Sequence, residues 1–311
     1  MRKILLFILL TLSLIYGQDF KKAGTSGFVF LELPVSAKSA ALGEASISLT
    51  DHGAAGLFIN PATTGFVENS HNLSVSYSPW IADISHYNTA YSFNSPLGVI
   101  SVGAIVMDYG SMKRTRSVGG QRLFEVTGSF DANAIALSLG YSRRLTDKFS
   151  FGAAFKYINE KIDIYSADNV VFDAGVLYFT GLGSLRLAAT IQNFGVDSKF
   201  INDSFRMPTV FRIGIAAELI GDYESEYRVT GIVEAFHPAD NDERLNVGTE
   251  ISWKNQITIR GGYKFFYDEE SYSFGIGVNP GLGYPAEIDF AYSDYGRLGE
   301  VLRFSLQLGI L

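Results

Sequence analysis

The segment Leu302-Arg303-Phe304-Ser305-Leu306-Gln307-Leu308-Gly309-Ile310, close to the end of the chain, decides the fold class. Large apolar residues stand at every second position, and small or polar residues stand between them. A period of two is the pattern of a β-strand, whose successive side chains point to opposite faces of a sheet. This segment therefore predicts a strand with one large apolar face and one small or polar face.

The same alternation recurs along the chain from His71 onward, for example in residues 134–142, 211–219, 245–253, 257–265, 272–278 and 288–292. A soluble sandwich would carry charges on its outward face, whereas here the polar face is mostly Gly, Ser and Ala with isolated ions. Such strands are typical of a barrel in lipid, with large residues facing out and small ones facing in. The pattern predicts an all-β fold, a transmembrane antiparallel β-barrel of about fourteen strands.

The segments between these strands differ in length. Tight turns containing Gly, Asn, Asp or Pro are expected at residues 94–96, 146–148, 181–183 and 254–256. Longer polar connections are expected at residues 108–131, 163–169, 196–207, 237–244 and 267–270. Outer-membrane barrels alternate short periplasmic turns with longer outside loops, so both ends of the barrel chain are expected on the periplasmic side.

The N-terminal residues predict export. Arg2 and Lys3 precede an apolar run at residues 4–14, and the small Gly17 is followed by the polar Gln18. The run is too short to anchor a protein across a bilayer, so residues 1–17 are interpreted as a cleavable signal peptide. The expected location is a bacterial outer membrane.

Composition agrees with a membrane barrel and excludes several classes of protein. The chain has 24 Phe, 17 Tyr and 32 Gly but only 18% charged residues, which is low for a soluble domain. It has no cysteine, which excludes disulfides and a lipid-modified cysteine. Its net charge of −7 argues against nucleic acid as a partner. The large apolar residues on one face of the strands make outer-membrane lipid the expected surrounding.

Residues 18–69 lack the strand pattern. They are rich in Ala, Gly and Ser between positions 36 and 48 and contain the motif Asn60-Pro61-Ala62. Small residues allow close packing against an inner wall that is itself lined with Gly and Ala. We therefore interpret this segment as an N-terminal plug, or hatch, inside a barrel formed by residues 70–311. A periplasmic extension is the alternative.

No catalytic, cofactor-binding or metal site is predicted. The four histidines, His52, His71, His86 and His237, are scattered and have no cysteine nearby, which disfavours a zinc or nucleophile–base site. The acidic residues at 240–243 and 268–270 lack the spacing of a calcium loop. The sequence therefore predicts a protein that is not an enzyme.

Isolated ions fall on the inward parity of the predicted strands. Buried charges need partners, so cross-strand pairs such as Glu250 with Arg260 or Asp289 with Arg303 are expected, some of them also contacting the plug. A polar pathway for small solutes is the alternative. The expected lumen ion network comprises Arg212, Glu218, Glu250, Arg260, Lys264, Asp289 and Arg303.

Several segments resemble, in order, the PorV/PorQ family, which is itself similar to FadL-type outer-membrane barrels. They are residues 24–30, 34–45, 58–62, 211–214, 246–250, 259–264, 274–277, 288–293 and 302–306. The resemblance implies a fourteen-stranded barrel with an inserted N-terminal segment. It also implies a part in the type IX secretion system, in which family members hold exported cargo proteins at the outer membrane. The chain departs from the usual barrel pattern by ending in Leu311 instead of an aromatic residue.

Two functions follow from these observations. The first is a barrel that docks or shuttles secreted proteins and contacts other secretion-system components, and the alternative is a FadL-like channel for hydrophobic small molecules. Inward positions hold chiefly Gly, Ala, Ser and ions, which favours docking. Aromatic anchors beside charges suit protein contacts, although such side chains can also fold over the barrel mouth. The candidate partner-binding residues of the loops are Phe200, Ile201, Phe205 and Phe236.

Overall fold

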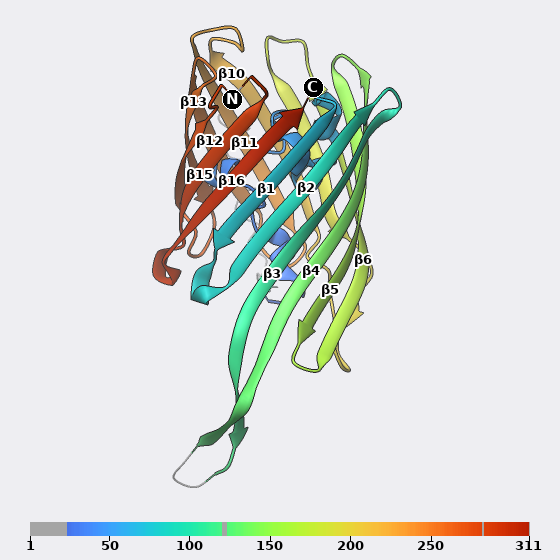
Figure 1. The fold of residues 1–311 in the computed structure, drawn as a ribbon, viewed down its shortest axis with the longest axis vertical. Coiled ribbons are helices and arrows are strands. Elements are labelled where there is room, and N and C mark those ends of the chain that lie inside the picture. The colour runs from blue at the N-terminus through green and yellow to red at the C-terminus, as the bar shows by residue number, and fades with distance from the viewer. Residues whose placement is uncertain (1–23, 120–122, 282, 311) are drawn as a thin grey trace, which may run out of the picture.

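The computed structural model describes residues 24–119, 123–281 and 283–310, so the predicted signal peptide lies outside the described residues. Fourteen strands form a closed antiparallel barrel in which each strand pairs with its neighbours in the chain and β1 pairs with β16 (Figure 1). The predicted fold class is confirmed. Within the described residues, no helix is long and apolar enough to cross a membrane.

The strands of the barrel differ in length, and β3 and β4 are the longest. Their bounds are β1 His71–Pro79, β2 Ser85–Ser95, β3 Gly98–Ser117, β4 Phe124–Thr146, β5 Phe149–Ile162, β6 Tyr165–Phe179, β7 Arg186–Phe194, β10 Val210–Ile220, β11 Tyr227–Pro238, β12 Arg244–Trp253, β13 Ile257–Phe265, β14 Tyr272–Val278, β15 Ala286–Asp294 and β16 Glu300–Ile310. A separate two-stranded sheet joins β8 (Ser198–Lys199) and β9 (Ser204–Phe205) within the connection from β7 to β10.

The two faces of each strand follow the predicted parity. In β16, Leu306 and Phe304 are exposed on the outside, whereas Ser305 and Arg303 are buried inside. Large apolar side chains cover the outside of the other strands as well, because every second residue of a strand points away from the lumen. The barrel therefore has an apolar outer face and a polar or small-residue inner face.

One end of the barrel, here called the turn end, carries the short connections. It holds the turns that follow β2, β4, β6, β10, β12 and β14, together with the start of β1 and the end of β16 (Figure 1, top). The four tight turns predicted from the sequence all lie here. The opposite end, here called the loop end, carries the connections that follow the odd-numbered strands from β1 to β5, then β7, β11, β13 and β15.

Two connections at the loop end are shorter than the sequence analysis expected. Most of residues 108–131 belongs to β3 and β4, which continue beyond their outer neighbours as a paired hairpin (Figure 1, bottom). The pairing extends to Ser117 and Phe124, where each strand hydrogen-bonds to the other and leaves the backbone groups on its outer edge open to solvent. The expected loop at 163–169 is also wrong, because β6 already begins at Tyr165 and only Asp163 and Ile164 form the turn.

The described residues before β1 lie inside the barrel and are called the plug. Short helical turns run through this segment, namely η1 Val29–Glu32, α2 Ala37–Ala41, η2 Gly53–Ala55, α3 Gly56–Ile59 and η3 Pro61–Phe66. The Ser36 side chain caps α2, and the Asn60 side chain caps η3 by accepting from Ala62 N. Two further turns, η4 Ile81–Asp83 and η5 Gly296–Leu298, lie in loop-end connections.

Candidate functional site

The plug is seated against glycines of the barrel wall. A Cβ added at Gly152 would lie 2.4 Å from the carbonyl carbon of Pro61, and one at Gly262 would lie 2.1 Å from the backbone nitrogen of Gly43. Neither backbone could stay in place beside a larger residue. Similar close approaches occur at Gly103, Gly140, Gly175, Gly248 and Gly275. The glycines of the inner face are therefore slots into which the plug fits.

The motif Asn60-Pro61-Ala62 lies at the centre of this contact. Asn60 is fully buried and donates from Nδ2 to the carbonyl oxygens of Ile47, at 2.9 Å, and of Val176 in β6, at 3.3 Å. Its Oδ1 accepts from Ala62 N at 3.0 Å. One amide side chain thus joins two parts of the plug to the wall, which gives this motif a structural role.

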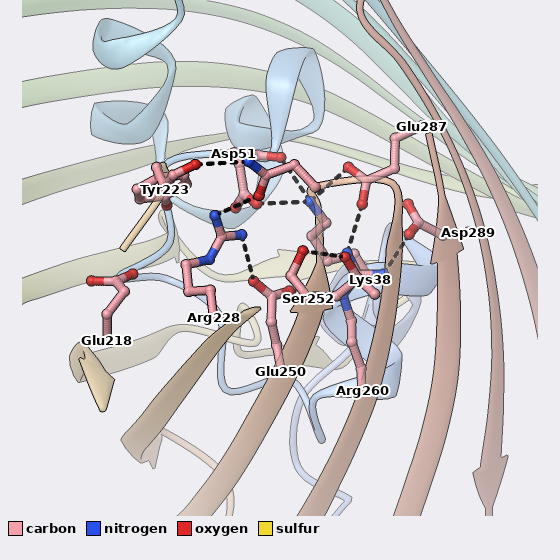
Figure 2. A network of polar contacts seen from close by, with 12 residues as sticks. Lys38, Asp51, Glu218, Tyr223, Arg228, Glu250, Ser252, Arg260, Glu287 and Asp289 are labelled. Carbon is pink, nitrogen blue, oxygen red and sulfur yellow. Dashed lines mark hydrogen bonds and ion pairs between the residues drawn. The ribbon is translucent and has the colours of Figure 1, made fainter. Parts of the chain in front are cut away.

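A network of ion pairs fixes another part of the plug near the turn end (Figure 2). Lys38 of α2 is fully buried, and its ammonium contacts Asp51 of the plug and Glu287 of β15. Arg260 of β13 contacts Glu287 at 2.6 Å and Asp289 at 2.5 Å. Because opposite charges surround each ion, the network offsets the cost of burying charge in the lumen.

The pairing of the predicted lumen ions follows the strand register. The expected contact between Glu250 and Arg260 is present, with Arg260 Nε 2.9 Å from the Glu250 carboxylate, because these residues are direct cross-strand partners. Asp289 contacts Arg260 instead of the expected Arg303. Residue 289 faces Ser305, while Arg303 faces Ala291, so the register sets Asp289 and Arg303 apart.

Arg212, Glu218 and Lys264 of the predicted network pair with residues outside that network. Arg212 contacts the buried Glu234 at 2.5 Å, and the same carboxylate accepts from Ser46 N and Ile47 N of the plug. Glu218 contacts Arg186 at 2.8 Å. Lys264 contacts Glu44 of the plug and Glu270.

Arg303 differs from these ions. Its side chain is fully buried, yet none of its three guanidinium nitrogens has a hydrogen-bond partner among the described residues. The guanidinium carbon lies 5.6 Å from the centre of the Trp80 ring. Its position on the inner face thus follows from the alternation of β16, and no carboxylate of the described residues pairs with it there.

A cavity of about 220 Å³, here called the mouth cavity, lies between the plug and the wall at the loop end. The plug supplies most of its apolar lining, including Val29, Leu31 and Phe58, and the wall adds Ile105 and Phe236. Its polar lining includes Lys156, Arg212 and Gln192. Glu44, Arg244 and Glu270 line it too, so polar and charged groups make up about half of its surface. The cavity thus combines an apolar part with a charged part.

Glu32 also lines the mouth cavity. Burial, with the charge of Asp240 as the second cause, raises the pKa of Glu32 to about 7. The Arg244 guanidinium lies 4.4 Å from the centre of the Tyr267 ring on the same side of the cavity. The rim of the cavity thus holds a carboxyl group that changes charge near neutral pH.

The predicted partner-binding residues lie mostly over the mouth of the barrel. Phe205 packs edge to face on the buried Phe28 of the plug, with ring centres 5.3 Å apart, and Phe200 packs on Phe205. Phe236 is buried within β11 beneath the Arg212 guanidinium and lines the mouth cavity. Ile201 alone of these four is exposed. The three aromatic side chains therefore follow the alternative that the sequence analysis left open, in which they fold over the barrel mouth, because the plug beneath the loop offers them an apolar partner. A role in binding a partner stays a prediction.

Other residues of the site had weaker signals in the sequence. Glu287 stands two positions before Asp289, so extending the predicted strand at 288–292 by one residue would have put both carboxylates on the inner face. Glu234 and Arg186 are buried on the inward faces of β11 and β7, whose weaker alternation did not single them out. Lys38 and Asp51 lie in the plug, where no periodic pattern indicates which side chains meet the wall.

Comparison with known proteins found no matching protein-family model and no matching curated protein. Solved structures do match. The toluene transporter TbuX of Ralstonia pickettii has a TM-score of 0.57 and 12% identity, over 89% of this chain and 98% of TbuX. The toluene transporter TodX of Pseudomonas putida has a TM-score of 0.61 and 12% identity, over 88% and 96%. A FadL homologue of Pseudomonas aeruginosa has a TM-score of 0.56 and 12% identity, over 89% and 98%. At this level of identity the likeness is one of fold, and the chain has the fold of the FadL-type barrels.

Proposed function

We propose that this protein is exported to a bacterial outer membrane, where it is a non-enzymatic channel for small hydrophobic molecules. The apolar outer face of the barrel suits lipid. A fold shared with toluene transporters supports the channel more than it supports the docking of secreted proteins. The alternative of the sequence analysis thus becomes the main proposal.

The mouth cavity carries this proposal. It lies where the plug leaves room below the loops, and its walls include Leu31, Phe58, Ile105 and Phe236. A small apolar molecule that packs against these side chains leaves water for the apolar part of the cavity, which is favourable by about 25 cal/mol per Å² of buried apolar area. The cavity is therefore suited to capture such molecules at the loop end, which faces outward in this proposal.

Uptake of radiolabelled toluene into cells tests the proposal. Ile105→Trp places a larger side chain in the mouth cavity and should reduce uptake several-fold. Val102→Trp is the matched control, because Val102 lies on the same strand but is exposed on the outer face. Uptake should also fall to background in cells that lack the protein.

Two results would count against a hydrophobic channel. The first is uptake by cells with the wild-type protein that stays at the background of cells without it. The second is equal uptake by Ile105→Trp and Val102→Trp cells in which both variants reach the outer membrane.

The docking of secreted proteins remains a second candidate because of the β3–β4 hairpin. Beyond Asp108 in β3 and Ala132 in β4, this hairpin has no further strand beside it. Exposed apolar residues stand near its tip, among them Leu123, Phe124 and Val126. Such a projection suits contact with another protein, as the resemblance to the PorV/PorQ family and its type IX secretion system implies.

Deletion of residues 111–129 separates the two candidates. A channel should keep its toluene uptake after the deletion, because the mouth cavity lies below the hairpin. A docking barrel should stay in the membrane but lose its secreted partner from a pull-down. Docking would be favoured if the deletion variant loses the partner and neither the wild-type protein nor the variant takes up toluene.

A further inference from the structure

A continuous polar surface runs along the inner faces of three adjacent strands, β16, β1 and β2. Its side chains meet in cross-strand rows, for example Ser305 with Ser76 and Ser76 with Asn88. We call this surface the seam. It consists of Asn72, Ser74, Ser76 and Ser78 of β1, His86, Asn88, Ala90 and Ser92 of β2, and Arg303, Ser305, Gln307 and Gly309 of β16.

Several side chains of the seam have polar atoms without a hydrogen-bond partner among the described residues. These atoms are both ring nitrogens of His86, both amide atoms of Asn88, Nε2 of Gln307 and all three guanidinium nitrogens of Arg303. The four residues are only 0%, 4%, 9% and 0% exposed. Buried polar groups almost always have a partner, and ordered water supplies it where the protein does not. Bound water molecules are therefore expected along the seam.

Room for water lies along the middle of the seam. A cavity of about 10 Å³ is lined by Asn88, Ser76 and Ser305 on the wall and by Ser36 and Phe58 of the plug. This volume is close to the minimum that holds one water molecule. The plug borders the cavity without filling it, since it is held there by its backbone. Its nitrogens donate to the hydroxyl groups of the wall, Ala37 N to Ser305 at 2.7 Å and Ala55 N to Ser74 at 3.2 Å.

At the turn end the seam meets a larger cavity of about 550 Å³. Gln307 lines both cavities, and Asn72 lines the larger one. The side chain of Gln307, with its unpartnered Nε2, thus borders both cavities. Water in the larger cavity can reach the middle of the seam by passing this residue.

At the loop end the seam reaches Arg303. Trp80 covers this guanidinium and packs edge to face on Tyr295, with ring centres 5.1 Å apart, and Tyr295 lines the mouth cavity. The carboxylates of Glu44 and Glu270, whose charges act on Arg303, are both bonded to Lys264. The seam therefore ends at a fixed positive charge just behind the mouth cavity.

We propose that the seam is a water pathway past the plug, separate from the route of hydrophobic molecules, and that Arg303 bars cations and protons from it. The unpartnered amide atoms of Asn88 and Gln307 can replace hydrogen bonds that water loses on entering a narrow pore. The serine oxygens can accept from water, although Ser76 and Ser78 donate their own protons to the Phe304 and Leu302 carbonyl oxygens. A buried arginine raises the electrostatic barrier to cations in such a pore. This activity goes beyond the proposed transport of hydrophobic molecules and does not depend on it.

Osmotic shrinkage of vesicles that contain the folded full-length mature protein tests the pathway. Stopped-flow light scattering should show wild-type vesicles shrinking several-fold faster than protein-free vesicles. Ser76→Leu places an apolar side chain in the middle of the seam and should return the rate to nearly that of protein-free vesicles. Val75→Leu is the control, because Val75 is its neighbour on the outer face of β1, and it should shrink like wild type.

A second variant keeps the test decisive if Ser76→Leu does not fold. Arg303→Met should let protons through, so that a pH dye inside the vesicles responds to an outside acid pulse several-fold faster than in wild-type vesicles. The pathway is ruled out if wild-type vesicles with a heat-modifiable, folded barrel shrink no faster than protein-free ones, or if folded Ser76→Leu shrinks like wild type. Equal proton leak in wild type and Arg303→Met would rule out the role of Arg303.

Discussion

Lys38 Nζ of the plug lies 2.8 Å from Glu287 Oε2 of strand β15, although 249 residues separate them in the chain. Burial alone would lower the pKa of Lys38, but the charges of Asp51 and Glu287 raise it above its ordinary value. The ammonium therefore stays charged inside the barrel. This ion pair joins the first segment of the described chain to one of its last strands.

Lys38→Met should loosen the plug. The change leaves Asp51 without its cation, while Glu287 keeps Arg260, and loss of one partner from a buried pair costs about 3–5 kcal/mol. The plug should become sensitive to protease in folded protein, measured as the rate of cleavage before His71. Lys113→Met on the exposed β3–β4 hairpin is the control and should leave the rate unchanged. A wild-type rate in Lys38→Met would mean that the ion pair does not hold the plug.

Gly152→Ala should displace the segment around Pro61. The new Cβ would lie 2.4 Å from the carbonyl carbon of Pro61, and overpacking of this kind costs about 1–3 kcal/mol. Urea unfolding in detergent measures the loss of stability. Gly261→Ala is the matched control, because its Cβ would face outward with its nearest neighbour 3.9 Å away. Equal stability of the two variants would contradict the close fit at Gly152.

Leu306→Arg should impair assembly by about 2–4 kcal/mol if Leu306 faces lipid near the middle of the bilayer. The residue is exposed on the outer face of β16 and pairs with Val75 and Ile288. Refolding into vesicles, followed by heat modifiability on gels, measures assembly. Leu298→Arg, in the exposed turn η5 at the loop end, should refold like wild type. Normal refolding of Leu306→Arg would exclude a lipid-facing position.

Glu32 should make the stability of the protein depend on pH between about 4.5 and 7. Its pKa is raised from 4.5 to about 7 in the fold, so the folded state holds a proton that the unfolded chain has released. This contribution is most favourable below pH 4.5, falls as the pH rises and is fully lost above about 7. Glu32→Gln should remove at most about 3 kcal/mol of this dependence. Parallel pH profiles of urea unfolding for both proteins would contradict the shift.

The sequence was sufficient to predict the barrel wall because a strand has a fixed period of two. Leu306 and Ser305 could be assigned to opposite faces from their positions alone, and the turns at the turn end follow from local Gly, Asn, Asp and Pro. The β3–β4 hairpin was missed for a related reason. Beyond Asp108, β3 is mostly polar, so no apolar period indicates that this strand continues. The alternation of Phe124, Val126 and Phe130 with polar residues in β4 was a signal that the sequence analysis did not use.

The mouth cavity could not be predicted from the strands. Its apolar lining comes mainly from plug residues such as Val29, Leu31 and Phe58, which have no regular period. An argument from inward strand positions therefore found only small residues and ions and favoured docking. The partners of the ions could be predicted only from the strand register. The register sets Asp289 beside Arg260, and it sets Arg303 opposite Ala291, where no carboxylate stands.

The contacts of the plug with distant strands also determine the order in which parts of the protein fold. Plug residues contact Gly152 in β5 as well as Gly262 in β13 and Glu287 in β15, so their final position requires both halves of the wall. The plug is made first, yet it cannot be completed until strands more than two hundred positions later have arrived. Contacts so distant in sequence slow folding, because a long chain must be ordered before they form. Until β1 pairs with β16, the wall cannot enclose the apolar residues of the plug, so closure of the barrel and burial of the plug occur together.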